Sequence, residues 1–165
     1  MANLRERASI CLQQIIIPSL AVLPPQMSAP WPMAWAMLAA IGLQESELRY
    51  REQHNGPARG LWQFETAGVA GVLSHSATGY LAVDVCHAHG VAATVDAVYQ
   101  NLSRDDGLAC CFARLLLWTL PDALPAEHEQ DKGWGQYMSA WRPGRPHPEK
   151  WSENWMAAWA AVRGL

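Results

Sequence analysis

The sequence predicts a mainly α-helical fold, and two patterns indicate it. Apolar residues fill the run 33–44 at helical spacing, so that its large side chains fall mostly on one face of a helix. Near the C-terminus Trp151, Trp155 and Trp159 are spaced by four, which places them along one face of another helix. We expect this second stripe to be a packing ridge.

Composition predicts one globular domain covering residues 1–165. Half of the residues are apolar and 16% are charged, which is typical of a chain with a packed core. The formal net charge of −3 argues against a protein that holds nucleic acid through phosphate contacts. We therefore expect no nucleic-acid partner.

The N-terminal half is predicted to hold two long helices. Residues 4–23 form the first, kinked at Pro18. A stiff connection follows, containing Pro24, Pro25 and Pro30, and Pro32 is well placed to begin the second helix, which runs to about Glu45 or Glu47. Residues 48–65 are polar and rich in turn formers, so we expect a loop with a short hairpin.

Helices are also predicted through the C-terminal half. Thr66 is a plausible N-cap for a short helix over 67–74. Helices over 77–89 and 91–103 follow, the first ended by Gly90. Asp105 and Asp106 are expected to cap an apolar helix over 108–120, which we expect to be buried at the centre. An acidic link over 121–132, a helix around 134–141, a proline-rich loop over 142–148 and the last helix complete the chain.

The four cysteines are interpreted as buried thiols of a protein in a reducing cytosol. They are Cys11, Cys86, Cys110 and Cys111, and no two of them form a CxxC pair. The adjacent Cys110 and Cys111 point to different helix faces and cannot easily bridge each other. The segment 86–89 places one thiol and two imidazole groups close together without a distant partner, so we expect neither a metal site nor a cofactor.

The N-terminus only partly imitates an export signal. Arg5 and Arg7 precede an apolar stretch, but polar residues interrupt it and Pro18 breaks it. The stretch is also too short to span a bilayer. We expect synthesis in the cytoplasm, no signal peptide and no membrane-spanning segment.

One carboxylate is a candidate for chemistry. Glu45 ends the apolar run 33–44, where a buried stem meets an opening. Partial desolvation there would raise the pKa of its carboxyl, as a general acid requires near neutral pH. The glycine-flanked segment 56–64 downstream is a candidate wall of the same cleft.

Two short motifs at these positions resemble those of a known family. Glu45-Ser46 and Gly60-Leu61-Trp62-Gln63 resemble the Glu-Ser and Gly-Leu-Met-Gln motifs of the lysozyme-like lytic transglycosylases, and the resemblance covers roughly residues 33–75. It implies a lysozyme-like helical domain with a small loop or β element lining the cleft. The size of the chain is similar to that of lysozyme-like proteins of bacteriophages and prophages.

The resemblance implies a catalytic role for Glu45 as general acid and base in cleaving the glycosidic bond between N-acetylmuramic acid and N-acetylglucosamine. Ser46 would orient its carboxyl group. Gln63 and the backbone around Gly60 would hold sugar substituents, and Trp62, which replaces the family methionine, would lie in the sugar-binding cleft. These roles would make the substrate the glycan strands of peptidoglycan.

Two further positions are chosen by role. The third family motif, Ala-x-Asn-Tyr, is absent; Tyr99 and Tyr137 are possible replacements for its tyrosine, and we favour Tyr137. A hydrolytic lysozyme would need a second carboxylate, for which we choose Glu65 because it ends the second motif. Transglycosylase and hydrolase remain alternatives.

A different class of function is also consistent with the sequence. The chain could be a non-catalytic, lysozyme-like virion component whose tryptophan-rich C-terminal region packs against a partner. The pairing of Glu45 with Gln63 favours the enzyme, whereas the absent third motif favours the structural protein. If the chain is an enzyme without an export signal, a holin or the virion would deliver it to the cell wall.

Overall fold

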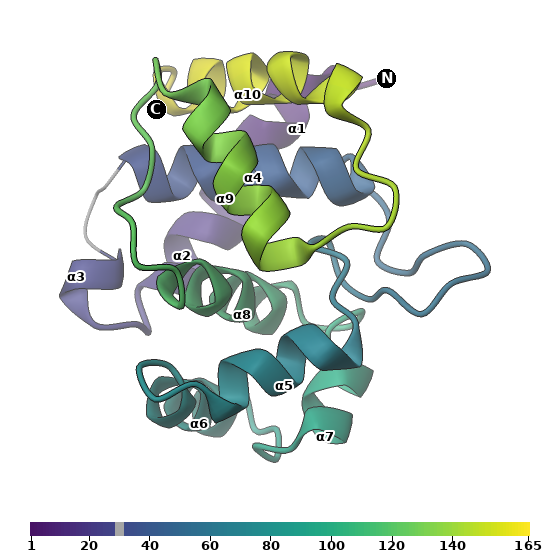
Figure 1. Cartoon of the computed structure of the whole chain (residues 1–165), viewed down its shortest axis with the longest axis vertical. Coiled ribbons are helices and arrows are strands. Elements are labelled where there is room, and N and C mark those ends of the chain that lie inside the picture. Colours follow the sequence, from purple (N-terminus) through teal and green to yellow (C-terminus); the bar gives the residue numbers. More distant parts are fainter. Residues whose placement is uncertain (29–31) are drawn as a thin grey trace.

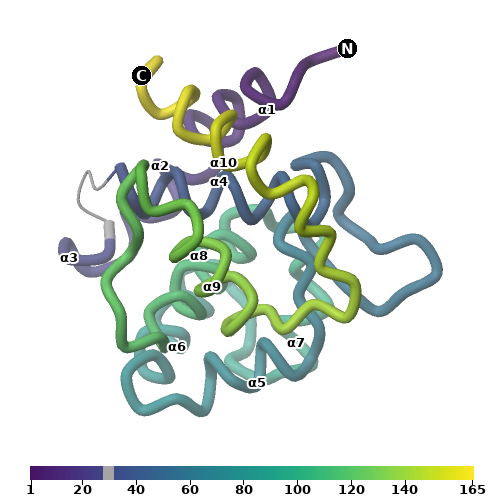
Figure 2. Tube along the Cα trace, turned by 45° about the horizontal axis from the view of Figure 1, so that its top comes forward, coloured from purple at the N-terminus to yellow at the C-terminus, as the bar shows by residue number. Residues whose placement is uncertain are grey.

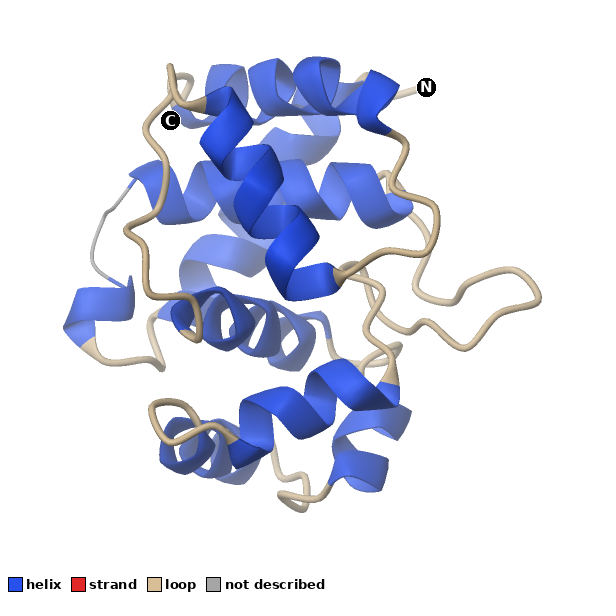
Figure 3. Ribbon diagram, viewed as in Figure 1, coloured by secondary structure: helices blue, strands red, loops and turns tan. Residues whose placement is uncertain are grey.

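The computed structural model describes residues 1–28 and 32–165, and within them it contains helices and loops but no strand (Figure 3). The prediction of a mainly α fold is therefore confirmed. In chain order the elements are α1 (Leu4–Cys11), the π-helical turn η1 (Leu12–Ile16), α2 (Ile17–Leu20), α3 (Pro25–Ser28), α4 (Pro32–Ser46), α5 (Thr66–Ser74), α6 (Gly79–Ala88), α7 (Val95–Asn101), α8 (Asp106–Trp118), α9 (Gln130–Trp141) and α10 (Pro148–Val162).

The N-terminal helix is continuous but irregular just before its proline. The chain passes from α1 through η1 into α2, and Pro18 stands in the first turn of α2. A proline ring collides with the carbonyl four residues earlier, here that of Gln14, and the wider π turn accommodates it. Part of the connection that we predicted to be stiff forms α3 instead, and Pro30 lies outside the described residues.

α4 is a central element of the molecule. It lies between α1 and α10 on one side and α8 on the other, as Figures 1 and 2 show from two directions. Its residues from 36 to 43 are all buried, so the expectation of one apolar face is wrong. Helices on opposite sides bury small residues such as Ala39 as well as large ones.

α8 is the other buried helix. The prediction that the helix after Asp105 is buried is confirmed, since every residue from 108 to 117 is buried.

A group of short helices packs beneath α8. α5 contacts α6 and α7, and α5 and α6 contact α8 (Figure 1). α5 begins one residue earlier than predicted: its N-cap is Glu65, and Thr66 is its first helical residue. Gly90 follows α6 with φ +67°, and Asp105 caps α8 by accepting a hydrogen bond from the Leu108 amide at 2.9 Å, both as predicted.

The loop between α4 and α5 projects from the body of the molecule (Figure 1). The predicted hairpin is reduced to two isolated bridges, Glu52 with Arg59 and Arg59 with Phe64. Gly60 adopts φ +77°, and a Cβ atom there would lie 2.8 Å from the carbonyl oxygen of Leu102. Only glycine satisfies both conditions, so Gly60 allows the loop to pack closely against the end of α7.

The C-terminal helices form an aromatic layer over α4. The rings of Trp151, Trp155 and Trp159 are nearly fully buried, which confirms the predicted packing ridge. α9 crosses this layer, and Gly133 lets it approach closely: a Cβ atom there would lie 2.7 Å from the Trp155 ring. α9 begins at Gln130, inside the segment that we predicted to be a link.

All four thiols are free and buried, as the sequence suggested. Burial raises the pKa of Cys11 and that of Cys111 to about 12, and it raises the pKa of Cys86 and Cys110 as well. Among the helices of the described residues, none is both long enough and apolar enough to cross a membrane.

Candidate active-site groove

A groove of about 920 Å³ opens on the side of the molecule where α4 ends. Its walls come from the end of α4, the loop before α5, the start of α5, the end of α8, α9 and the loop 142–147. The titratable residues that line it are Glu45, Glu65, His75, Tyr137, Arg142, Arg145 and His147.

Glu45 lies at the C-terminal end of α4, between the packed core and the groove. Burial raises the pKa of its carboxyl, a hydrogen bond from Tyr137 lowers it, and the negative charge of Glu65 raises it, so that the pKa moves from 4.5 to about 7 in all. A carboxyl group with such a pKa holds its proton at mildly acidic pH and releases it just above neutrality. It can therefore act both as an acid and as a base.

Tyr137 is the partner of this carboxyl group. Its hydroxyl donates a hydrogen bond to Oε1 of Glu45 at 2.6 Å, from α9 to the end of α4. Its ring is almost fully buried and stacks on Trp151, with 5.5 Å between centroids and 10° between planes. Burial, followed by the charge of Glu45, raises the pKa of Tyr137, so the phenol keeps its proton and remains a donor.

The sequence offered two tyrosines, of which we favoured Tyr137, and their contacts in the structure differ. The hydroxyl of Tyr99 donates to the carbonyl of Pro57, and its ring lies 5.8 Å from the guanidinium of Arg59. Tyr99 thus supports the projecting loop, whereas Tyr137 contacts Glu45. Of the two, the favoured Tyr137 is the one in contact with the carboxyl group, and its role there stays a prediction.

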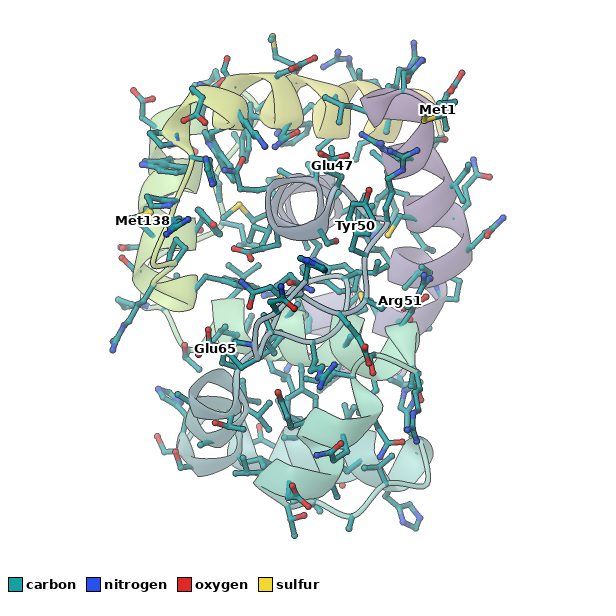
Figure 4. All side chains as sticks on the ribbon, turned by 90° about the vertical axis from the view of Figure 1, so that its right-hand side faces the viewer. Met1, Glu47, Tyr50, Arg51, Glu65 and Met138 are labelled. Atoms are coloured by element: carbon teal, nitrogen blue, oxygen red, sulfur yellow. The ribbon has the colours of Figure 1, made fainter. Side chains whose placement is uncertain are left out.

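Two other predicted residues line the groove. Glu65, the N-cap of α5, is exposed to it, whereas Glu47 lies on the side of α4 that faces α1 (Figure 4). Gln63 adopts φ +50°, and its side-chain amide donates to the Gly60 carbonyl at 2.9 Å. This local bond holds the Gln63 side chain at the groove wall.

Three predicted placements are corrected. Trp62 is fully buried and donates from its ring nitrogen to the Leu38 carbonyl at 2.9 Å, so it cannot stack on a sugar in the groove. The Ser46 hydroxyl bonds to the Leu61 carbonyl at 2.6 Å, so it ties α4 to the loop instead of orienting Glu45. Gly60 is a packed turn outside the groove lining. The motif residues 60–62 therefore pack behind the groove wall and do not line the groove.

Sequence reasoning missed two residues that shape the groove. Gln44 donates to the carbonyls of Pro146 and His147 at 2.7 and 3.0 Å, and it accepts from Asn154 at 2.9 Å. Trp141 lines the groove and donates to the Trp62 carbonyl at 2.8 Å. Gln44 directly precedes Glu45 in the sequence, and this adjacency was the one feature that could have placed Gln44 near the groove.

No group of three or more His, Cys, Asp or Glu side chains in residues 1–28 and 32–165 could hold a metal ion. The groove chemistry available to the chain itself is proton transfer by Glu45, hydrogen bonding by Tyr137 and Gln63, and charge on two arginines. No family model, curated protein or solved structure gave a significant match to this chain.

Proposed function

We propose that this protein cleaves the glycosidic bond between N-acetylmuramic acid and N-acetylglucosamine in peptidoglycan, with Glu45 as general acid and base. The proposal rests on the motif resemblance at 45–46 and 60–63 and on one physical observation. That observation is a carboxyl group of pKa about 7, hydrogen-bonded to Tyr137, at the wall of a groove with room for several sugar rings.

Bond cleavage begins with a proton transfer. Protonated Glu45 donates to the glycosidic oxygen, the bond from that oxygen to C1 breaks with its electron pair, and an oxocarbenium-like species forms at C1. Because Tyr137 occupies Oε1 as a donor, Oε2 is the oxygen that carries the transferable proton. The same hydrogen bond then stabilises the carboxylate that remains.

The second step distinguishes two enzymes. In a lytic transglycosylase the Glu45 carboxylate takes the proton of the C6 hydroxyl of N-acetylmuramic acid, whose oxygen bonds to C1 and closes a 1,6-anhydro ring. In a hydrolase, water attacks C1 with help from a second carboxylate, and Glu65 on the groove wall is the available one. We favour the transglycosylase because the motifs resemble that family.

The test is the digestion of purified cell walls by the wild-type protein and by Glu45→Gln. The variant keeps an oxygen that accepts from Tyr137 but has no transferable carboxyl proton, so we expect soluble products to fall by about 100-fold or more. Mass spectrometry of the wild-type products then assigns the route. Anhydro ends indicate the transglycosylase, and reducing ends indicate the hydrolase.

Glu47→Gln is the matched control. Glu47 stands two positions later and is exposed. It pairs with Arg7 at 3.5 Å and with Arg49 at 3.8 Å, and these contacts lie outside the groove. It should digest walls as the wild type does. Cleavage retained by Glu45→Gln would remove Glu45 from the mechanism, and a wild-type protein that releases no product would favour the non-catalytic virion component.

A further inference from the structure

The loop 142–147 gives one edge of the groove a positive charge. Arg142 and Arg145 both line the groove from this loop, and Glu45 and Glu65 line it from α4 and the start of α5. The groove therefore has an acidic side, where the proposed chemistry takes place, and a cationic edge beside it.

The two arginines differ from most surface arginines of this protein. Arg51 pairs with Asp106 at 2.6 Å, Arg59 with Glu52 at 2.9 Å, and Arg163 with Glu127. In the described part of the chain neither Arg142 nor Arg145 forms an ion pair, although Arg142 bonds weakly to its own helix through the Ser139 carbonyl at 3.4 Å. Their charges are left available to a ligand in the groove.

The loop that carries them is fixed in place. Gln44, the neighbour of Glu45, donates to two of its carbonyls, and Pro143 and Pro146 restrict its backbone. Asn154 of α10 holds Gln44 in turn at 2.9 Å. A preorganised loop loses little conformational entropy when it binds, so its guanidinium groups are suited to recognition.

We propose that Arg142 and Arg145 bind carboxylates of the stem peptide, so that the preferred substrate is peptide-bearing glycan. The inference rests on the proposed function. The amino sugars themselves offer no free carboxylate, because the lactyl group of N-acetylmuramic acid is joined to the peptide, whereas acidic residues and the C-terminus of the stem offer several. A guanidinium binds a carboxylate through two parallel hydrogen bonds.

The test compares two substrates: cell walls freed of teichoic acid, and the same walls after carbodiimide and ammonia have converted the peptide carboxylates to amides. For Arg142→Gln/Arg145→Gln we expect KM to rise about tenfold on the untreated walls and to stay unchanged on the amidated walls. Added salt should raise KM of the wild type on the untreated walls and affect the double variant less. Arg104→Gln, an exposed arginine outside the groove lining, is the control.

An equal change on both substrates, or no change on either, would overturn the inference. If the wild type cleaves neither substrate, the proposed function fails, and the inference is then decided by binding. Calorimetry with a soluble disaccharide bearing its stem peptide, set against the same molecule with its peptide carboxylates converted to amides, supplies that measurement. Weaker binding of the peptide-bearing ligand to the double variant supports the peptide-carboxylate site, and unchanged binding rejects it.

Discussion

Two opposing effects set the pKa of Glu45, and the contact with Tyr137 is one of them. Burial favours the neutral carboxyl group, while the phenol hydrogen bond favours the carboxylate, and the pKa settles at about 7. A group with this pKa is half protonated near neutrality, which suits a residue that gives and then recovers a proton. The same balance links Glu45 to the stability of the folded chain.

Stability should depend on pH through Glu45. Its pKa is about 7 in the folded protein against 4.5 for a free glutamate, so the folded state binds this proton more tightly. The resulting stabilisation is complete below pH 4.5 and is lost as pH rises through about 7. Relative to Glu45→Gln, the wild type should lose about 3 kcal/mol of unfolding free energy between pH 4.5 and pH 8.

Urea unfolding of both proteins at the two pH values measures this difference, and the titrations of all other groups cancel between them. Glu47→Gln should follow the wild type, because that side chain, just after the end of α4, is exposed and lies toward Arg7 of α1. A gap between wild type and Glu45→Gln that does not change with pH would mean that the carboxyl group is solvated in the folded protein.

At the scale of residues, the sequence predicted the location of a charged group well, but it did not predict locations that depend on tertiary packing. Glu45 at the end of an apolar run was expected at an opening, and it lines the groove. Trp62 carries both an apolar surface and a donor, so either a cleft or the core could satisfy it. The Leu38 carbonyl that accepts its N–H lies 24 residues away and is invisible in the sequence pattern.

At the scale of elements, the packing of α9 on α10 positions Tyr137. Gly133 is buried against the rings of Trp151 and Trp155, and Gly135, two positions later in the same helix, has open space where a Cβ atom would be. The two glycines therefore separate the conformational effect of an added methyl group from its steric effect.

Gly133→Ala should destabilise the protein by about 1–3 kcal/mol, because the new methyl group would overlap the Trp155 ring. Gly135→Ala should stabilise it by about 0.5–1 kcal/mol, because alanine favours the helix and meets nothing. Urea unfolding of the two variants provides the comparison. Equal effects of the same sign would show that α9 and α10 do not pack this closely.

Element-scale prediction worked for type and less well for boundaries and burial. Capping by Asp105 and termination at Gly90 were visible because they depend on local residues. The all-round burial of α4 depends on helices distant in sequence, α1, α8 and α10, whereas the spacing of its large side chains suggested only one apolar face. The loop 48–65 has turn residues but little alternation, and its pairing stops at two bridges.

At the scale of the whole molecule, the two ends of the chain are packed together. α1 contacts α10, and both lie against α4, so neither end can leave without exposing the core (Figure 2). The buried tryptophans of α10 and the helices around α8 are connected through α4. This arrangement predicts one cooperative unit.

Unfolding should therefore be a single transition. Tryptophan fluorescence reports mainly on the aromatic layer of α9 and α10, whereas far-ultraviolet circular dichroism reports on all helices. Their midpoints in urea should coincide. A fluorescence midpoint well below that of circular dichroism would show that the C-terminal layer separates before the rest unfolds.

The four thiols have a practical consequence. Alkylating reagents react with the thiolate form, and every native cysteine is both enclosed and held in its protonated state. A cysteine introduced at Ser139, on the groove rim, would thus be the site at which a fluorophore or cross-linker attaches while the fold persists. Because the native cysteines react little with such reagents, the label at position 139 would report on molecules that enter the groove.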